Sequence, residues 1–176
     1  GHRPEAETAG GAGAGGSPEG RRSGRMPDAE ARALQERLAD GRSRGARGDV
    51  LLLLEHDPVV TVGRGADAAA LIVPGLEVIA VERGGEATYH GPGQLVAYPI
   101  LLLGEDRRDL HRYLRDLEEV VIRVLAEVEI AALRRAGLTG VWVGEKQICS
   151  IGVAVRRWVT LHGLPLTLPT GAQASA

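Results

Sequence analysis

Runs of apolar residues along the chain predict several buried strands. Val50–Leu54 is continuously apolar and Val59–Val62 is a shorter run of the same kind, as is typical of strands inside a sheet. Val78–Val81 and Leu95–Leu103 predict two more strands. Within the latter, Pro99 indicates an edge or a bulge, because proline has no N–H to donate to a sheet ladder.

Apolar residues at helical spacing predict two helices. Asp28 is placed to cap the first, which runs to about Asp40, and Asp109 starts the second. The apolar face of the second helix contains Leu110, Tyr113, Leu114, Leu117, Val121, Val124, Leu125 and Val128. Val141–Val143 and a last extended run, Ile148–Val155, then read as strands. Strands and helices in this order favour an α/β or α+β fold: a mixed β-sheet with flanking helices.

Composition divides the chain into three parts. Residues 1–25 are rich in Gly, Ala, Arg and Glu with almost no large apolar side chain, so we expect them to be disordered. Met26 is the only methionine, which makes it a candidate for the start of the protein. Residues 26–164 then form the domain, with a flexible linker at Gly41–Gly48, and residues 165–176 form a low-complexity tail.

Charge and cysteine content exclude several classes of function. The net charge of −2 gives no basic field for nucleic acid. No apolar segment approaches the length of about 20 residues that a membrane helix needs, and no signal peptide is visible. Cys149 is the only cysteine, so no internal disulfide forms and we expect a cytoplasmic location. A zinc site built from Cys149 and the histidines is set aside, because no pair has the usual short ligand spacing.

The segment Arg83–Gln94 concentrates the chemistry of the chain. It holds four glycines, a proline, a histidine and an arginine, and it leads directly into a predicted strand. Glycines allow the backbone to approach a ligand closely, and loops held by a rigid sheet are common binding sites. A turn-rich connection between two strands is the simpler alternative.

Five ordered blocks, this segment among them, resemble the lipoyl(octanoyl) transferases, the octanoyltransferases of lipoate synthesis. The blocks are Leu54–Gly63, Arg83–Gln94, Thr139–Val143, Ile148–Val153 and Arg156–Gly163. The resemblance implies the catalytic fold of biotin and lipoate protein ligases. It also implies transfer of an octanoyl group from acyl carrier protein to a lysine of a lipoyl domain, through a cysteine thioester and without cofactor or metal. The implied acceptors are the lipoyl domains of 2-oxoacid dehydrogenases and the glycine cleavage H protein.

The resemblance also implies which residues line the acyl site. They are Arg83, Gly84, Gly85, Glu86, Ala87, Thr88, Tyr89, His90, Ser150, Ile151 and Gly152, followed by a turn at Gly163, Leu164 and Pro165. Backbone N–H groups of Gly84, Gly85 and Gly152 are suited to hold the oxygen of a tetrahedral intermediate. We expect His90 to hydrogen-bond across the pocket. The alternatives for the other histidines are a turn residue for His56, an exposed helix position for His111 and a packed loop residue for His162. The motif context favours a site role for His162, as it does for His90.

Two departures from the family pattern bear on activity. Gln147 occupies the position of the family's lysine, and Lys146 precedes it; in an extended segment this shift turns the lysine to the opposite face. The family's nucleophilic cysteine, in a Pro-Cys-Gly segment, is absent, which we interpret as a truncation or a shifted reading frame near Pro165.

Cys149 is not expected to replace that nucleophile, because it lies in an apolar strand. In such a setting a cysteine packs like a small apolar residue, and the pKa of its thiol is raised. We therefore expect an octanoyltransferase-like chain that is inactive as it stands. The alternatives are a non-catalytic protein that binds an acyl chain or a carrier domain and, with less support, an ATP-dependent ligase, for which no phosphate-binding loop is visible.

Overall fold

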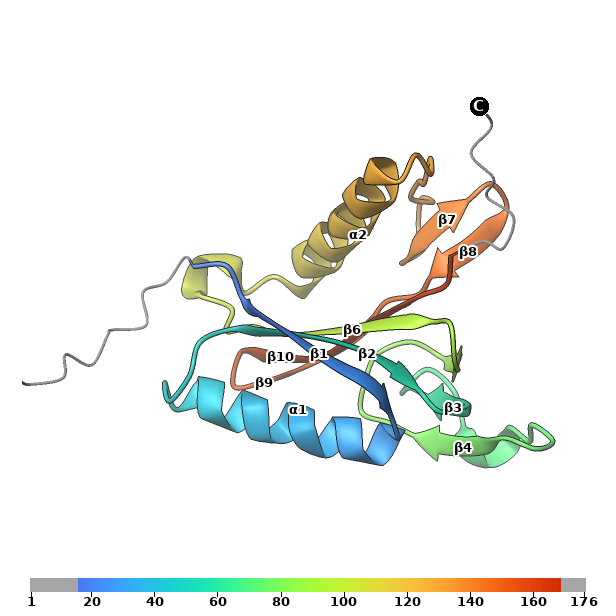
Figure 1. Ribbon diagram of the computed structural model, residues 1–176, viewed down its shortest axis with the longest axis horizontal. Coiled ribbons are helices and arrows are strands. Elements are labelled where there is room, and N and C mark those ends of the chain that lie inside the picture. The colour runs from blue at the N-terminus through green and yellow to red at the C-terminus, as the bar shows by residue number, and fades with distance from the viewer. Residues whose placement is uncertain (1–15, 169–176) are drawn as a thin grey trace, which may run out of the picture.

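The computed structural model describes residues 16–168, which form two β-sheets and two long helices (Figure 1). The elements are β1 (Glu19–Met26), α1 (Asp28–Ser43), β2 (Val50–His56), β3 (Val59–Val62), η1 (Ala68–Ala70), β4 (Glu77–Ala80), β5 (Ala87–His90), β6 (Leu95–Ile100), η2 (Glu105–Arg107), α2 (Leu110–Glu127), β7 (Val141–Val143), β8 (Lys146–Cys149), β9 (Gly152–Arg156) and β10 (Val159–Leu166). The predicted mixed α+β class is confirmed. No helix within the described range is long and apolar enough to cross a membrane.

The larger sheet has the strand order β1-β2-β6-β10-β8-β7, and β9 pairs with β10. β1 runs parallel to β2, whereas the other pairs are antiparallel. A smaller sheet has the order β4-β3-β5, with β3 and β4 parallel. The glycine-rich segment therefore begins after β4 and returns through β5 at the edge of the smaller sheet.

The two long helices cover opposite faces of the larger sheet (Figure 1). Side chains alternate between the faces along each inner strand, as the two-residue period of a strand requires. On β2, Leu52 packs in the cluster under α1, while Leu51 and Leu53 pack against the cluster under α2. On β6, Tyr98 belongs to the α1 side and Ala97 to the α2 side. The apolar run Val50–Leu54 is thus an inner strand, as predicted.

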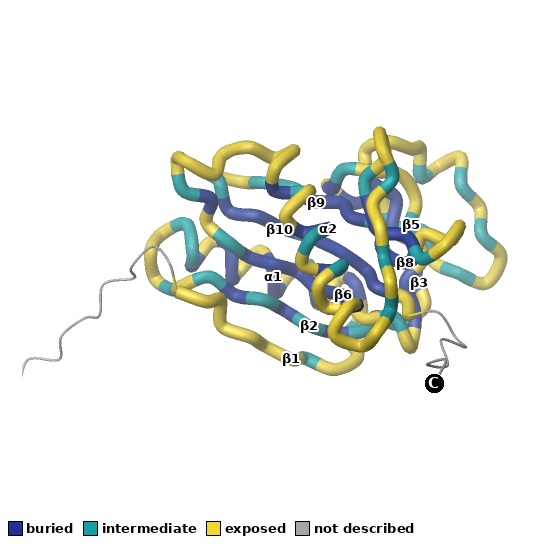
Figure 2. Tube along the Cα trace, turned by 90° about the horizontal axis from the view of Figure 1, so that it is seen from above, coloured by how far each residue is buried: buried dark blue, intermediate teal, exposed yellow. Residues whose placement is uncertain are grey.

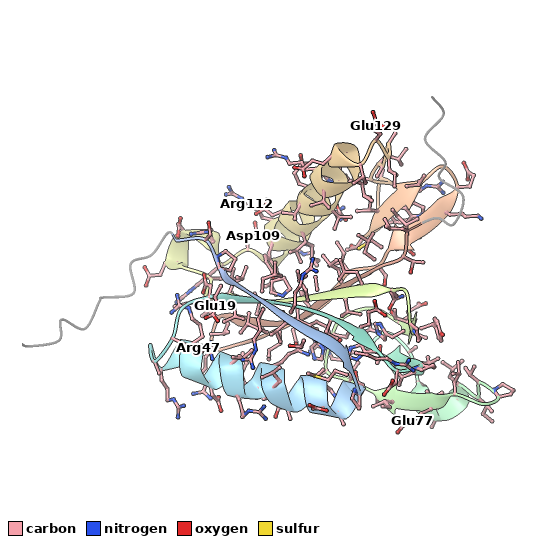
Figure 3. All side chains as sticks on the ribbon, in the orientation of Figure 1. Glu19, Arg47, Glu77, Asp109, Arg112 and Glu129 are labelled. Carbon is pink, nitrogen blue, oxygen red and sulfur yellow. The ribbon has the colours of Figure 1, made fainter. Side chains whose placement is uncertain are left out.

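The prediction of disorder for residues 1–25 is wrong for the part that forms β1. This strand is exposed, as Figure 2 shows, so side-chain burial does not hold it in place. Its backbone pairs with β2 instead, and the Glu19 N–H donates to Asp49 O at 2.9 Å. Ion pairs add to this: Arg25 with Asp57 at 2.5 Å, and Arg47 with Glu19 at 3.6 Å (Figure 3). Residues 16–18 belong to no helix or strand, and residues 1–15 of the segment that was expected to be disordered lie outside the described residues.

Pro99 lies on an inner strand and not at an edge. The Thr160 hydroxyl of β10 donates to the Pro99 carbonyl oxygen at 2.6 Å and accepts from the Leu101 N–H at 3.0 Å. The pairing between β6 and β10 is interrupted here, between the Ala97–Leu164 pair and the Leu102–Val159 bridge. The register is the same on both sides of this gap, because the two pairs are separated by equal lengths of β6 and β10, so neither the edge nor the bulge that was predicted is found. The gap in the ladder accommodates a residue without an N–H.

Both helices occur where they were predicted, with different capping. Asp109 caps α2 by accepting from the Arg112 N–H at 3.0 Å; both residues are labelled in Figure 3. The N-cap of α1 is Pro27, and Asp28 is its first helical residue, without a side-chain cap. This helix continues to Ser43, into the segment that was predicted to be a linker.

The C-terminal part of the fold contains a strand that was not predicted. The extended run Ile148–Val155 is divided between β8 and β9, and residues 159–166 form β10, which borders β6, β8 and β9. Gly163, Leu164 and Pro165 belong to this strand and do not form a turn. Two residues of the expected low-complexity tail, 165 and 166, are therefore part of the sheet, and residues 169–176 lie outside the described range.

Candidate acyl-binding site

A cleft of ≈ 510 Å³ brings together most of the residues predicted to form the site. Its volume lies within the range of about 300–1,000 Å³ that is usual for small-molecule sites. Twelve of the fourteen predicted residues line it: Arg83, Gly85, Glu86, Ala87, Thr88, His90, Ser150, Ile151, Gly152, Gly163, Leu164 and Pro165. Gly84 and Tyr89 do not. The loop before β5 thus faces β9 and β10, which are distant from it in sequence.

Gly84 and Tyr89 are absent from the cleft for local reasons. The Gly84 N–H donates to Val153 O at 3.1 Å, so it is not free for an oxyanion and its predicted role is wrong. Tyr89 lies between Thr88 and His90 on β5, and alternation along the strand turns its side chain outward, where it is 52% exposed. The binding loop is therefore partly fastened to β9 by its own backbone.

The segment that follows β3 holds the carbonyl groups of the glycine-rich loop. The N–H groups of Gly63, Arg64 and Gly65 donate to Glu86 O, Arg83 O and Gly85 O at 3.0, 3.0 and 2.9 Å. A Cβ atom at Gly63 would collide with the Gly85 carbonyl, so this approach requires glycine. The loop keeps a fixed shape because backbone groups on both sides bind it.

His90 stands at the end of a directed chain of hydrogen bonds. Gln94 Oε1 can only accept, so the His90 Nδ1–H donates to it at 2.9 Å and Nε2 is left as an acceptor. The Thr61 hydroxyl donates to that Nε2 at 3.0 Å and itself accepts from Arg83 Nη2 at 2.9 Å. His90 thus hydrogen-bonds to Thr61 of the paired strand β3 and to Gln94, four residues away, and no bond across the cleft is found among the described residues. Both ring nitrogens are occupied, and burial lowers the pKa of His90 to about 4, so this histidine is a neutral structural group.

Arg83 is buried beneath the cleft and is bound mainly by the protein. Its guanidinium donates to Thr61 O at 3.0 Å and to Gly84 O at 2.9 Å, in addition to the Thr61 hydroxyl. Burial lowers the pKa of this guanidinium. Asp28 is the buried acidic residue of the same cleft, and it pairs with Arg32 at 2.8 Å.

His56 is a buried structural group and not a turn residue. Its Nδ1–H donates to Met26 O at 2.9 Å, so Nε2 accepts from the Tyr98 hydroxyl at 2.6 Å. Burial raises the pKa of Tyr98, which therefore remains protonated. This pair connects the end of β1 to the cleft wall, because Tyr98 lines the cleft.

Gln147 and Lys146 lie as the strand alternation predicted. Gln147 lines the cleft opposite Trp142 and donates to Thr139 O at 3.2 Å. Lys146 is exposed and does not line the cleft. The position that the family pattern gives to a lysine is thus occupied by an uncharged side chain.

Cys149 is a buried core residue and does not line the cleft. It is 1% exposed within the apolar cluster beneath α2. Burial, followed by the nearby Glu118, raises the pKa of its thiol to about 12. A thiol in this state is not a nucleophile at neutral pH, which agrees with the structural role that was predicted.

Several cleft residues were not predicted from the sequence: Asp28 as a lining residue, Thr61, Tyr98, Leu138 and Trp142. Thr61 carried a usable signal, since it is a hydroxyl inside the apolar run Val59–Val62. His162 lines the cleft from β10. Within residues 16–168 there is no group of three or more His, Cys, Asp or Glu side chains arranged to hold a metal ion.

Comparison with known proteins finds relatives over most of the chain. Residues 27–172 match the lipoyl protein ligase A/B catalytic domain. An octanoyltransferase of Geobacter metallireducens is 51% identical over 145 residues, covering 82% of this chain and 68% of that protein. An octanoyltransferase of Gloeobacter violaceus is 54% identical over 132 residues, covering 74% of this chain and 60% of that protein. The chain thus spans roughly two thirds of the length of such relatives or somewhat less.

Solved structures show the same fold at lower identity. A bipartite lipoate protein ligase from Thermoplasma acidophilum, studied with its E2 lipoyl domain, matches with a TM-score of 0.63 and 21% identity, covering 88% of this chain and 63% of that one. A lipoate-protein ligase A bound with ATP matches with a TM-score of 0.66 and 21% identity, covering 86% and 68%.

Proposed function

Because the chain belongs to the lipoyl protein ligase A/B catalytic domain family, we propose that its cleft binds the octanoyl group that octanoyltransferases of lipoate synthesis transfer. The observation that carries this proposal is the meeting of Arg83–His90 with β9 and β10 around one cavity of ≈ 510 Å³. Apolar side chains supply the wall an alkyl chain needs, namely Val81, Leu138, Trp142, Ile151 and Leu164. The polar part of the same lining contains Thr61, Arg83, His90, Tyr98 and His162.

The donor and acceptor follow from the same proposal. Acyl carrier protein would deliver the octanoyl group, and a lysine of a lipoyl domain, in 2-oxoacid dehydrogenases or the glycine cleavage H protein, would receive it. The chain's similarity to octanoyltransferases supports this assignment. The lipoyl domain that accompanies the ligase from Thermoplasma acidophilum supports an acceptor of that class.

For the 176 residues given, we infer binding without transfer. The only cysteine is Cys149, whose thiol is buried away from the cleft. Gln147 faces the cleft without a charge, so no lysine at this position assists a nucleophile. A protein that holds an acyl chain or a carrier domain without turnover is therefore the second candidate function, and it uses the same cleft.

Acyl binding is tested by the fluorescence of Trp142, which lines the cleft, in a Trp158→Phe background. Octanamide is the probe, because it carries the alkyl chain and a neutral carbonyl. Burial of a methylene contributes about 0.8 kcal/mol, so hexanamide is expected to bind about 15-fold more weakly than octanamide. Equal affinity of the two amides, or no fluorescence change with either, would contradict an acyl cleft.

Transfer is tested separately with octanoyl-acyl carrier protein and a lipoyl domain, using mass spectrometry of the acceptor lysine. We expect no transfer above the rate without protein. Transfer by the wild-type chain that disappears in Cys149→Ser would overturn the inference of binding without turnover, and it would leave the acyl cleft in place.

A further inference from the structure

His162 reaches the cleft from β10 with an unusual backbone conformation. Its φ is 59°, in the left-handed region that non-glycine residues rarely adopt. Gln35 of α1 holds this conformation, because its Oε1 accepts the His162 N–H at 2.8 Å. Strained residues of this kind persist where the surrounding structure fixes them, and they cluster at ligand sites.

The neighbouring residue makes the arrangement rigid. A Cβ atom at Gly163 would collide with the Ala97 carbonyl and with Pro99 on β6, so the chain passes β6 closely at this point. The His162 backbone therefore cannot relax toward β6. Its ring lies beside Tyr98, with ring centroids 6.3 Å apart and planes at 90°.

The His162 ring differs from the other two histidines of this region in its hydrogen bonds. Each ring nitrogen of His56 and of His90 is engaged by the protein. Among residues 16–168 no such partner exists for the His162 ring, and its nitrogens are not enclosed by protein either. His162 thus presents a donor and an acceptor to whatever enters the cleft.

We propose that His162 donates a hydrogen bond to the carbonyl oxygen of the bound acyl group, and that Gln35 is its positioning residue. This inference rests on the proposed acyl-binding function. A neutral imidazole carries one N–H and one bare nitrogen, so it can donate to a carbonyl without adding a charge to a half-apolar site. Burial, followed by the charge of Arg83, lowers the pKa of His162 to about 4, which keeps the ring neutral near pH 7.

Gln35 supports this assignment by its position. It is 2% exposed on the face of α1 that packs in the apolar cluster with Leu34 and Leu38. A buried amide group is costly unless it makes a hydrogen bond; Gln35 Oε1 makes one to the His162 N–H, whereas Gln35 Nε2 has no partner among the described residues. Gln35 Oε1 therefore stabilises the backbone orientation of one cleft residue, His162.

The test uses the full chain labelled with ¹⁵N-histidine and titrated with octanamide, the His162 imidazole signals being assigned with His162→Asn. Asparagine adopts the left-handed region more readily than most residues, so this variant is expected to fold. We expect the His162 ring signals to shift on binding. Loss of one neutral hydrogen bond should weaken octanamide binding about fivefold in His162→Asn.

Gln35→Met removes the acceptor of the His162 N–H and should weaken binding by a similar factor, whereas Gln35→Glu keeps an acceptor oxygen and should restore it. His111→Asn, at an exposed position on α2, is the matched control and should bind like the wild type. Octanamide binding with unmoved His162 signals, or undiminished affinity in His162→Asn, would overturn the role of His162 alone. An absence of octanamide binding in the wild type would overturn the acyl cleft itself and the His162 contact with it.

Discussion

The buried carboxylate of Glu118 offers the most demanding test of how the cleft wall is held. It lies on α2 with no exposure of its side chain, and it accepts four hydrogen bonds. Arg115 Nη1 donates to both oxygens at 2.9 Å, Arg134 Nε donates at 3.0 Å, and the Gly140 N–H donates at 2.9 Å. Gly140 leads from Leu138 and Thr139, which line the cleft, into β7.

Glu118→Gln should destabilise the protein by removing the charge that these partners share. A carboxamide still offers one oxygen to Gly140, but its NH₂ group faces arginine donors. Breaking a buried charge pair costs ~3–5 kcal/mol. The side chains of Arg115 and Arg134 are 44% and 37% exposed and stay hydrated, so we expect the lower end, about 3 kcal/mol. For a chain of this size that corresponds to a fall in Tm of roughly 6–12 °C.

Urea unfolding followed by circular dichroism measures this free energy directly. The matched control is Glu119→Gln, which removes the adjacent carboxylate; that side chain is 39% exposed and pairs with Arg123 and Arg134. Water replaces such exposed pairs easily, so the control should change little. Equal urea midpoints for the two variants would refute the reasoning that the buried carboxylate organises this wall.

Three further changes address other parts of the structure. Gly163→Ala places a methyl group against the Ala97 carbonyl and should lower the urea midpoint strongly, whereas Gly48→Ala, with open space around it, should leave the midpoint unchanged. Cys149, with a pKa of about 12, should resist iodoacetamide at pH 8 until urea is added; rapid labelling of the native protein would contradict its burial. The pKa of His90 is lowered to about 4, so the unfolded chain takes up its proton first as the pH falls below about 6.5. His90 should therefore contribute about 3 kcal/mol to the decrease in the free energy of unfolding toward pH 4, in addition to the contribution of His162, and the decrease in His90→Gln should be smaller than in the wild type by about that amount.

The sequence predicted the elements whose own pattern decides their structure. The second long helix and its Asp109 cap follow from a period that depends only on local residues. The opposite placement of Gln147 and Lys146 also follows from local geometry, because neighbouring residues in a strand point to opposite faces. Most residues of the predicted binding loop also lie in the cleft, because a loop that directly connects two strands remains next to the sheet that contains them.

Elements that depend on distant partners could not be predicted in this way. β1 has almost no apolar side chain and is ordered because β2 offers it an edge. Residues 163–165 look like a turn in sequence, yet they form a strand because β6 accepts a residue without a side chain at Gly163. Glu118 is charged on a helix and would be expected at the surface, but two arginines and a backbone N–H, from residues 3 to 22 positions away, make its burial favourable.

The hydrogen bonds of the cleft distinguish two groups of residues: those whose polar groups are used by the protein itself, and those that can still bind a ligand. Arg83 donates to Thr61 and Gly84, and His90 uses both ring nitrogens on Thr61 and Gln94. Arg83 and His90, the two residues of the loop most often found in binding and catalysis, therefore mainly stabilise the shape of the loop. In the proposed acyl site, recognition of the carbonyl is left to groups with free hydrogen-bonding capacity, of which His162 is the clearest, and recognition of the alkyl chain is left to the apolar wall. We therefore expect the cleft to select a ligand by chain length and by one polar contact, whether or not transfer follows.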